Sequence, residues 1–449
     1  MFRKILIANR GEIALRVIRA CREMGIRSVI AHSEADRNSL PVRLADERIC
    51  IGPGASGKSY LNIPNIISAA LISHAEAIHP GYGFLSENTS FAEICNDVNI
   101  TFIGPSAKVM SIMGDKVSAR EAMTRAGLPT LPGTQVLHTL EEAQKVAREI
   151  GFPLMLKAVA GGGGRGIRLI NHPDEFDRVF TVAQNEVREA FKDDGIYLER
   201  YVKKARHIEI QVLVDNYGHG VHLGERNCSC QRRNQKVLEE APSPLLPREL
   251  CEEIGQKAVC AVEEVGYSNA GTLEFLVDEQ NRYYFMEMNT RLQVEHPVTE
   301  FITGLDLVKE QIRIADGLPL QLEQKDVKLR GHAIECRITA EDADANFRPQ
   351  TGVVEQYLPP GGPGVRLDSH LYAGYEVPPY YDSLLGKLIV WAETREAAIA
   401  RMQRALDEFL IEGITTTIPF HQRLLKHEGF IQGDTYTRFI QDEAAALGI

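Results

Sequence analysis

Two acidic residues near the middle of the chain are spaced so that their carboxylates could meet. Glu274 and Glu287 each lie in a strand-like run, and we expect a hairpin with a two-residue turn at Gln280–Asn281. With that turn Glu274 faces Glu287, and Asn289 lies on the same face because side chains alternate along a strand. Opposed carboxylates repel, whereas Mg²⁺ or Mn²⁺, as one or two ions, would reverse that interaction. We therefore predict a metal site at these three residues; the alternative is a solvent-exposed polar strip.

Three polar residues continue this alternation downstream. If the chain stays extended through Val294, then Arg291, Gln293 and Glu295 place a cation, an amide and a carboxylate along one side. Such a trio suits a small oxyanion that must be held and deprotonated.

A dense run of glycines lies further upstream, between two strand-like segments. Lys157 belongs to the first segment, 153–158; the glycines are Gly161–Gly164 and Gly166, and 167–170 is the returning strand. Glycine runs mark a close approach of backbone to ligand or a moving lid, and their N–H groups can bind polyphosphate. We predict that Lys157 and this loop bind phosphates, the alternative being a solvated lysine beside a flexible loop. A protein kinase is excluded because in kinases the glycine loop comes before the strand that carries the lysine, whereas here Lys157 comes before the glycines.

Two other nucleotide-binding patterns occur near the N-terminus. Gly52–Ser59 matches the phosphate-loop motif G-x-x-x-x-G-K-S, but a helix must begin at its Lys-Ser, and Pro64 would break that helix. A P-loop NTPase therefore stays only as an alternative. The first turn, residues 9–14, has one glycine where a dinucleotide-binding turn needs three, which argues against NAD.

A zinc site is a further alternative. His219, His222, Cys228 and Cys230 are close in sequence, but Cys-x-Cys lacks the usual ligand spacing and no second pair follows. The eight cysteines mostly lie in apolar or helical patterns, which predicts a reducing, cytoplasmic location.

The elements that would position these residues change in kind along the chain. Near the N-terminus, strand-like runs occur at 4–8, 28–32, 48–51, 77–79 and 101–104, and helical patterns at 12–24 and 65–73. This βαβ series predicts a parallel sheet wrapped by helices.

The pattern differs in the rest of the chain. Helices expected at 117–125 and 140–150 are followed by hairpin-like strand pairs. From residue 331 a strand at 332–338 leads to helices expected at 395–409 and 435–446. The sequence therefore predicts an α/β region followed by α+β regions.

Composition limits the classes of partner. The 449 residues are 44% hydrophobic and 25% charged, which is enough for two to four globular domains. The formal net charge is -11, with no long Lys/Arg run, so we expect no nucleic-acid partner. No run approaches eighteen apolar residues and the first ten residues do not form a signal peptide, so we expect no membrane span.

Two longer motifs make the chain recognisable. Residues 79–88 (HPGYGFLSEN) and 287–300 (EMNTRLQVEHPVTE) resemble hallmarks of biotin carboxylase. Shorter matches, in the same order as in that family, are GDK at 114–116, Lys157 with the glycine loop, QRRNQK at 231–236, HAIECR at 332–337 and YYDS at 380–383. The resemblance covers essentially the whole chain.

The resemblance implies an ATP-grasp fold with flanking domains. Residues 1–114 would form an N-terminal Rossmann-like domain and 115–330 the ATP-grasp domain, with a small glycine-loop lid at about 131–203. Residues 331–449 would form an α+β C-terminal domain.

The resemblance also implies roles for single residues. ATP would contact Lys116, Lys157, Gly163, Gly164, Glu199, Tyr201, Val202, His207, Gln231 and Asn234, and its metal would be held by Glu274, Glu287 and Asn289. Bicarbonate and biotin would contact Lys236, Arg291, Gln293, Val294, Arg337 and Tyr82. The chain departs from many relatives at Asn234, where they have histidine, and at Val159–Ala160, where they have more glycine.

The mechanism implied by the resemblance has two steps. Glu295 would deprotonate bicarbonate, which attacks ATP to give carboxyphosphate and ADP. Breakdown of carboxyphosphate would then carboxylate biotin, with Arg337 stabilising the biotin enolate and Lys236 and Arg291 completing the catalytic set.

The resemblance implies a homodimer and separate partner proteins. Because the chain has no Met-Lys-Met biotin-attachment motif, the biotin carboxyl carrier protein and the carboxyltransferase are expected to be other proteins. Acetyl-CoA carboxylase is the expected assembly, with pyruvate or another acyl-CoA as alternative acceptors. Another ATP-grasp ligase and a non-catalytic nucleotide-binding scaffold are the remaining alternatives.

Overall fold

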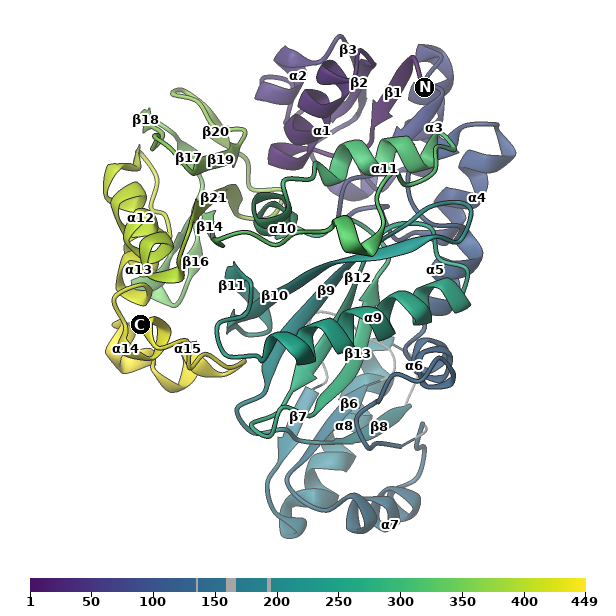
Figure 1. Cartoon of the computed structure of the whole chain (residues 1–449), viewed down its shortest axis with the longest axis vertical. Coiled ribbons are helices and arrows are strands. Elements are labelled where there is room, and N and C mark those ends of the chain that lie inside the picture. Colours follow the sequence, from purple (N-terminus) through teal and green to yellow (C-terminus); the bar gives the residue numbers. More distant parts are fainter. Residues whose placement is uncertain (135, 159–166, 192–194) are drawn as a thin grey trace.

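Three larger sheets organise the part of the chain described here. The computed structural model describes residues 1–134, 136–158, 167–191 and 195–449. In Figure 1 a five-stranded sheet lies at the top, an eight-stranded sheet in the middle and a three-stranded sheet at the bottom. The predicted combination of α/β and α+β parts is confirmed.

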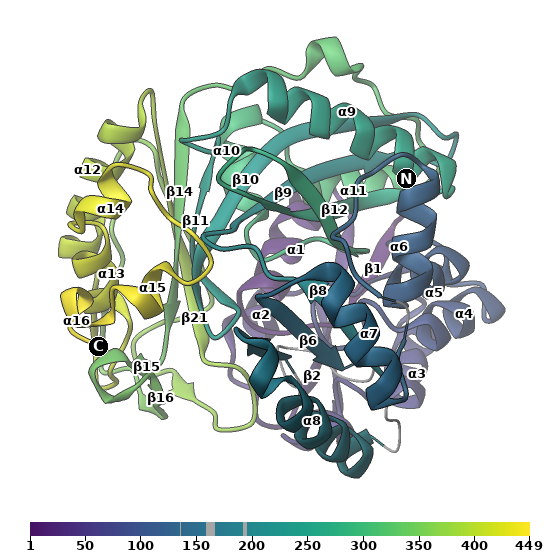
Figure 2. The ribbon, with the colours of Figure 1, turned by 90° about the horizontal axis from the view of Figure 1, so that it is seen from below.

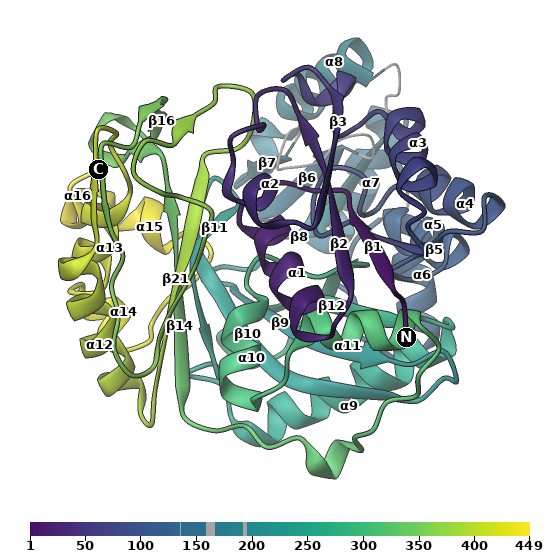
Figure 3. The ribbon, with the colours of Figure 1, turned by 90° about the horizontal axis from the view of Figure 1, so that it is seen from above.

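The N-terminal sheet is parallel, with strand order β3-β2-β1-β4-β5. Its strands are β1 (Lys4–Ile7), β2 (Arg27–Ser33), β3 (Glu47–Gly52), β4 (Ala77–His79) and β5 (Thr101–Phe102). The helices of this region are α1 (Gly11–Glu23), α2 (Leu40–Leu44), α3 (Ile63–Ser73), α4 (Thr89–Asp97) and α5 (Ala107–Gly114). Figure 3 shows β1 to β3 from above with α1 and α2 beside them. The central strand β1 is buried throughout, as expected for a parallel strand covered on both faces.

The glycine-containing segment 52–59 does not form a phosphate loop. A short 3₁₀ turn covers Ser56–Lys58, and the next helix is α3, whose N-terminus is capped by the Asn62 side chain. Pro64 lies in the first turn of α3, where its missing N–H needs no partner. The P-loop alternative is therefore wrong, because no helix begins at this segment's Lys-Ser.

The central sheet has the order β13-β12-β9-β10-β11-β14-β21-β19, with antiparallel neighbours. Its strands are β9 (Arg206–Val214), β10 (Gly220–Arg232), β11 (Gln235–Ala241), β12 (Asn269–Val277), β13 (Tyr283–Asn289), β14 (His332–Thr339), β19 (Val365–Ser369) and β21 (Leu384–Ala392). Since β11 pairs with β14, the sheet continues across the predicted boundary at residue 330. The boundaries at residues 114 and 330 stay predictions.

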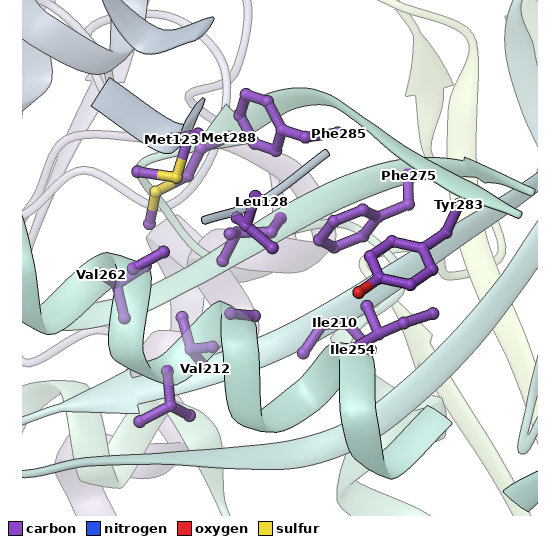
Figure 4. Close-up of a cluster of buried hydrophobic side chains, with 14 of the residues drawn as sticks. Met123, Leu128, Ile210, Val212, Ile254, Val262, Phe275, Tyr283, Phe285 and Met288 are labelled. Atoms are coloured by element: carbon purple, nitrogen blue, oxygen red, sulfur yellow. The ribbon is translucent and has the colours of Figure 1, made fainter. Parts of the chain in front are cut away.

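A hydrophobic core fixes the hairpin of β12 and β13 to the rest of this sheet (Figure 4). Ile254 and Val262 of helix α9 (Arg248–Glu264) belong to the same buried cluster as the side chains of β9. Within the hairpin, Phe275 packs edge-on against Tyr283 and Phe285, with ring centroids 6.0 and 6.1 Å apart. Each such buried side chain contributes about 1.5–3 kcal/mol, so the hairpin is held rigidly.

The lid contains the smaller antiparallel sheet, with order β7-β6-β8. Its elements are β6 (Leu154–Ala158), β7 (Ile167–Ile170), β8 (Ile196–Arg200), α7 (Leu140–Ile150) and α8 (Phe176–Phe191). Figure 2 shows α7 and α8 in front of β6 and β8. The predicted strand pair on either side of the glycines is confirmed, whereas Val159–Ala160 and the glycine loop, with Gly163 and Gly164, lie outside the described residues. The lid limits of about 131 and 203 stay predictions.

Helices and short strands complete the remaining regions. The helices are α6 (Lys116–Arg125), α10 (His296–Thr303), α11 (Leu307–Ala315), α12 (Arg395–Glu408), α13 (Ile418–Leu424), α14 (Glu428–Ile431), α15 (Phe439–Asp442) and α16 (Ala444–Leu447). The short strands are β15 (Glu341–Asp342), β16 (Arg348–Pro349), β17 (Gly352–Val353), β18 (Gln356–Leu358), β20 (Glu376–Val377) and β22 (Leu410–Glu412).

The last predicted helix, 435–446, is wrong. Its place is taken by α15 and α16, which are separated at Glu443, where φ is -100° and ψ is 16°. The break lets Phe439, Ile440 and Leu447 all enter the same hydrophobic core. Among the described residues, no helix combines the length and apolarity needed to cross a bilayer.

Candidate active site

The hairpin of β12 and β13 brings Glu274 opposite Glu287, as predicted, but by a different route. The turn is longer than expected, because the Asp278 carboxylate accepts from the N–H of Arg282 and closes a wider loop. That register alone would oppose Glu274 to Met286. A β-bulge there adds one residue and restores the Glu274–Glu287 pair. The predicted two-residue turn is wrong, and the bulge compensates for it.

A cavity of about 1130 Å³ is lined by the central sheet, the lid and the C-terminal region. Every predicted site residue that the structure describes lines it. These residues are Tyr82, Lys116, Lys157, Glu199, Tyr201, Val202, His207, Gln231, Asn234, Lys236, Glu274, Glu287, Asn289, Arg291, Gln293, Val294, Glu295 and Arg337. Side chains from distant parts of the sequence therefore share one site.

Lys236 on β11 is a cationic centre of this cavity. Its Nζ donates to Oε1 of Glu274 at 2.9 Å and to Oε1 of Glu295 at 2.7 Å, and it also pairs with Glu209. Although burial opposes its charge, these carboxylates hold the pKa of Lys236 well above its usual value. The ammonium is therefore a fixed charge that can hold an anion.

Glu274 gathers donors from several elements. Its Oε1 accepts from Lys236, from Nδ2 of Asn289 at 2.7 Å and from Nε2 of Gln293 at 2.8 Å, while Nε2 of His207 lies 3.0 Å from its Oε2. Burial opposes ionisation, but Lys236 and His207 hold the pKa of Glu274 well below its usual value. This carboxylate stays ionised.

The pKa of Glu287 is shifted in the opposite direction from that of Glu274, and this contrast fits a metal site. Burial and the neighbouring charge of Glu274 raise the pKa of Glu287. A divalent cation between the two carboxylates would remove this repulsion. Nδ2 of Asn289 now donates to Glu274, so Asn289 would join the hard ligands that Mg²⁺ or Mn²⁺ prefers by turning its amide oxygen toward the ion. The residues present therefore fit such an ion.

His207 on β9 connects this pair to the next strand. Its Nδ1 lies 2.7 Å from Nε2 of Gln231, and its Nε2 contacts Glu274 and, at 3.3 Å, Glu209. Although burial opposes its charge, the two carboxylates raise the pKa of His207 to about 9. Glu274 and Glu209 therefore favour the protonated imidazole.

Arg337 and Glu295 form a largely buried ion pair of the cavity. Nη2 of Arg337 donates to Oε2 of Glu295 at 2.9 Å, and Nε donates to Glu239 at 2.7 Å. Although burial opposes ionisation, Lys236 and Arg337 hold the pKa of Glu295 below its usual value. Burial raises the pKa of Glu239 to about 7. Glu295 is therefore the carboxylate of these two that is ionised.

The chain does not stay extended after β13, so that part of the prediction is wrong. Glu295 immediately precedes α10, whose first turn contains Pro297, and Nζ of Lys387 fixes the preceding bend by donating to the carbonyl of Val294 at 2.7 Å. The side chains of Arg291, Gln293 and Glu295 still line the cavity. The bend thus replaces strand alternation as the cause of their convergence.

Arg291 is held at the rim of the cavity. Its Nε donates to Oε2 of Glu87 at 2.9 Å, and its Nη2 donates to Oδ1 of Asn289 at 3.0 Å. These two contacts fix the guanidinium beside Asn289, one of the predicted metal ligands.

The lid side of the cavity combines apolar walls with charge. Leu131, Met155 and Leu276 line it together with Tyr201 and Val202. Nζ of Lys157 lies 2.6 Å from Oε2 of Glu199 at the same end. Apolar walls beside cations suit a planar heterocycle that carries phosphates.

Tyr82 is positioned by a tight turn after β4. Nδ2 of Asn9 donates to the carbonyls of Pro80 and Tyr82, each at 2.7 Å, and the Tyr82 hydroxyl bonds to Glu12. Gly81, with φ of 63°, approaches Asn9 so closely that a Cβ atom would lie 2.8 Å from Nδ2. The glycine is required for this turn.

Comparisons with known proteins agree with this geometry. Residues 1–110 match the family described as "Biotin carboxylase, N-terminal domain", 115–323 match "Carbamoyl-phosphate synthase L chain, ATP binding domain", and 335–442 match "Biotin carboxylase C-terminal domain". The chain is 60% identical over 442 residues to the biotin carboxylase of Nostoc sp., covering 98% of this chain and 99% of that protein. The chain belongs to the biotin carboxylase family.

Other relatives act within different carboxylases. One belongs to the pyruvate carboxylase of Methanothermobacter thermautotrophicus and is 52% identical over 98% of this chain and 90% of that protein. Another is the biotin carboxylase domain of Hydrogenobacter thermophilus 2-oxoglutarate carboxylase, a dimer solved with MgADP, ADP and bicarbonate. It matches with a TM-score of 0.94 and 50% identity, over 100% of this chain and 99% of that one. The biotin carboxylase fold, with its ATP-grasp domain, is confirmed.

Three acidic residues of this biotin carboxylase fold were absent from the predicted site. Glu209 pairs with Lys236, Glu239 with Arg337, and Glu87 with Arg291. Glu209 could have been predicted, because it is two residues after His207 in the same strand and so lies on the same face. Glu87 could have been predicted from its place inside the motif at 79–88. The Glu239 contact depends on the register of β11 against β14, which the sequence does not reveal.

The potential zinc ligands do not gather in the biotin carboxylase fold. Among the described residues, the close groups of possible metal ligands are His207, Glu209 and Glu274, and Glu209, Cys228 and Glu295. Neither group contains His219, His222 or Cys230.

Proposed function

We propose that this chain uses MgATP and bicarbonate to carboxylate biotin on a separate carrier protein, releasing ADP and phosphate. The observation that carries the proposal is the ionised Glu295, contacted by both Lys236 and Arg337 beside the Glu274–Glu287 pair. This arrangement puts a base, an anion site and a metal site in one cavity. The family relationship supports the same reaction.

The nucleotide is proposed to bind between the lid and the central sheet. The proposed ATP contacts are Lys116, Lys157, Gly163, Gly164, Glu199, Tyr201, Val202, His207, Gln231 and Asn234, with metal ligands Glu274, Glu287 and Asn289. A bound Mg²⁺ would offset the negative charge of the phosphates. Asn234 lies in the β10–β11 turn with φ of 63°, a conformation that asparagine tolerates well.

The first step activates bicarbonate. Lys236, Arg291, Gln293 and the backbone at Val294 hold the anion, and Glu295 removes its proton. The oxygen freed in this way attacks the γ-phosphate, ADP leaves, and carboxyphosphate forms. Closure of the lid excludes water, which matters because this mixed anhydride hydrolyses readily.

The second step transfers the carboxyl group. Carboxyphosphate breaks down to carbon dioxide and phosphate, and the phosphate takes the proton from the biotin ureido nitrogen. Arg337 stabilises the enolate that results, and Tyr82 lines this end of the cavity. Attack of the nitrogen on carbon dioxide completes carboxybiotin.

The partners proposed are a biotin carboxyl carrier protein and a carboxyltransferase, with the chain itself as a homodimer. We infer acetyl-CoA carboxylase as the assembly; the pyruvate and 2-oxoglutarate carboxylase relatives keep other acceptors as alternatives. The eight cysteines are all free and six are buried, which supports a reducing cytoplasm as the location.

The proposal is tested by measuring ADP release with ATP, bicarbonate, free biotin and Mg²⁺, and with each omitted in turn. ADP release that requires bicarbonate and is stimulated by biotin is expected. Turnover indifferent to biotin would favour another ATP-grasp ligase, and nucleotide binding without turnover would favour a scaffold.

A further inference from the structure

Arg226, a buried arginine next to the proposed bicarbonate contact Gln293, uses each of its guanidinium nitrogens as a hydrogen-bond donor to neighbouring side chains. Arg226 on β10 has no exposed surface. Its Nη1 donates to Gln211 at 2.8 Å and to Thr299 at 3.0 Å, and its Nε donates to Glu209 at 3.2 Å. Its Nη2 donates to Oε1 of Gln293 at 2.6 Å. Arg226 is not among the residues that line the cavity, so it can act on a bound anion only through its neighbours.

The contact with Arg226 decides which way the Gln293 amide points. A guanidinium carries five N–H donors and no acceptor, so only the amide oxygen can face it. The amide nitrogen must then face the opposite way, where it donates to Oε1 of Glu274 at 2.8 Å. With the amide reversed, its oxygen would meet a carboxylate and its nitrogen would meet a cation, and both contacts would be repulsive.

This orientation has a consequence for the cavity. A primary amide has two N–H groups. Among the described residues, Glu274 is the acceptor for Nε2 of Gln293, which leaves a second N–H for an acceptor-rich anion. We propose that Arg226 is a positioning residue that locks Gln293 as a hydrogen-bond donor and thereby sets the affinity for bicarbonate. The proposal rests on the function proposed above.

The test compares Michaelis constants. In Arg226→Met the oxygen of Gln293 loses the donor that holds the amide in place, so the KM for bicarbonate should rise about 10- to 100-fold, the range for a hydrogen bond to a charged group. The KM for ATP should change by less than about two-fold, since Arg226 bonds to none of the proposed nucleotide contacts. Equal rises in both constants would mean general damage to the site and would overturn the proposal.

A double-mutant cycle separates action through Gln293 from action through Glu209. Gln293→Ala should raise the KM for bicarbonate by itself, and adding Arg226→Met should then raise it by less than about two-fold further. Multiplication of the two effects would show that Arg226 acts by another route and would overturn the proposal. Thr299→Val, which removes a different acceptor of Arg226, is the matched control and should leave this constant unchanged.

Two further measurements keep the test decisive. If Arg226→Met does not fold, Arg226→Gln replaces it in the same cycle with the same outcomes, because an amide keeps a polar side chain there but can face either end of the Gln293 amide. The affinity for MgADP, measured by calorimetry, reports whether each variant is folded. If ADP release by the wild type does not depend on bicarbonate, the proposed function is refuted. If it does depend on bicarbonate and Arg226→Met has the same KM for bicarbonate as the wild type, only this inference is refuted.

Discussion

Nη2 of Arg337 lies 2.9 Å from Oε2 of Glu295, so the residue proposed to stabilise the biotin enolate is ion-paired with the residue proposed to deprotonate bicarbonate. Both side chains are largely buried, which makes the pair strongly coupled. The two steps of the reaction therefore share one set of charges, and a change at either residue should affect both.

Arg337→Ala should lower biotin-dependent ADP release about 100- to 1000-fold, because preorganised positive charge at the enolate is lost. The MgADP affinity should stay within about two-fold, since the partners of Arg337 are Glu239 and Glu295 and not the proposed nucleotide contacts. Removal of the cation should also raise the pKa of Glu295, moving the acidic limb of the pH–rate profile to higher pH. Steady-state kinetics from about pH 5 to 9 measures both effects. Arg404→Ala, which breaks an exposed pair with Glu408, is the control, and an equal loss of nucleotide affinity would refute the placement.

His207 should make stability fall at alkaline pH. Its folded pKa of about 9 lies above the ordinary value of 6.5. The charged imidazole therefore contributes stability that is fully present below about pH 6.5 and is lost as pH rises toward 9, up to about 3 kcal/mol. Thermal unfolding at about pH 6.5, 8 and 9.5 should show a steeper fall for wild type than for His207→Gln. Parallel curves for the two proteins would contradict this assignment.

Metal binding should release protons from Glu287. Burial and Glu274 raise the pKa of Glu287, whereas a divalent cation would stabilise its ionised form and lower that pKa. Titration of Mg²⁺ with ADP near about pH 6, in buffers of different ionisation enthalpy, should therefore reveal release of a fraction of a proton. Glu287→Gln should reduce the release to that of Mg²⁺ binding to ADP alone, and should weaken Mg²⁺ binding at least about ten-fold. The same proton release from this variant would place the titrating group elsewhere.

The two lysine-containing glycine segments should respond differently to mutation. Lys58→Ala should leave ADP release unchanged, because Lys58 is exposed and no helix begins beside it. Lys157→Ala should raise the KM for ATP about ten-fold or more, because it removes a cation that lines the cavity. Steady-state kinetics of the two variants makes the comparison, and loss of ATP affinity in Lys58→Ala would revive the phosphate-loop alternative.

Local patterns in the sequence predicted much of this architecture. The alternation of β-rich and helical runs gave β1, α7 and most of α12 almost to the residue. The prediction failed at 435–446, because α15 begins only at Phe439, after the weak helix formers at 435–437, and the chain breaks at Glu443 where the core admits Leu447. It also failed at the β12–β13 turn, because the Asp278 side chain selects a longer loop.

The sequence by itself determined which chemistry is present, because residue type and spacing follow directly from the chain. It gave paired acids at Glu274 and Glu287, and a cation, an amide and a carboxylate at Arg291, Gln293 and Glu295. The tertiary structure decided which of these groups touch. The pairing of β10, β11 and β14 brings Lys236 and Arg337 to Glu295 and Glu239, and thereby shifts the pKa values of these two carboxyl groups. The fold also brings Arg226 against Gln293. Such contacts join residues far apart in sequence, and their energies depend on desolvation, which exists only after the chain has folded.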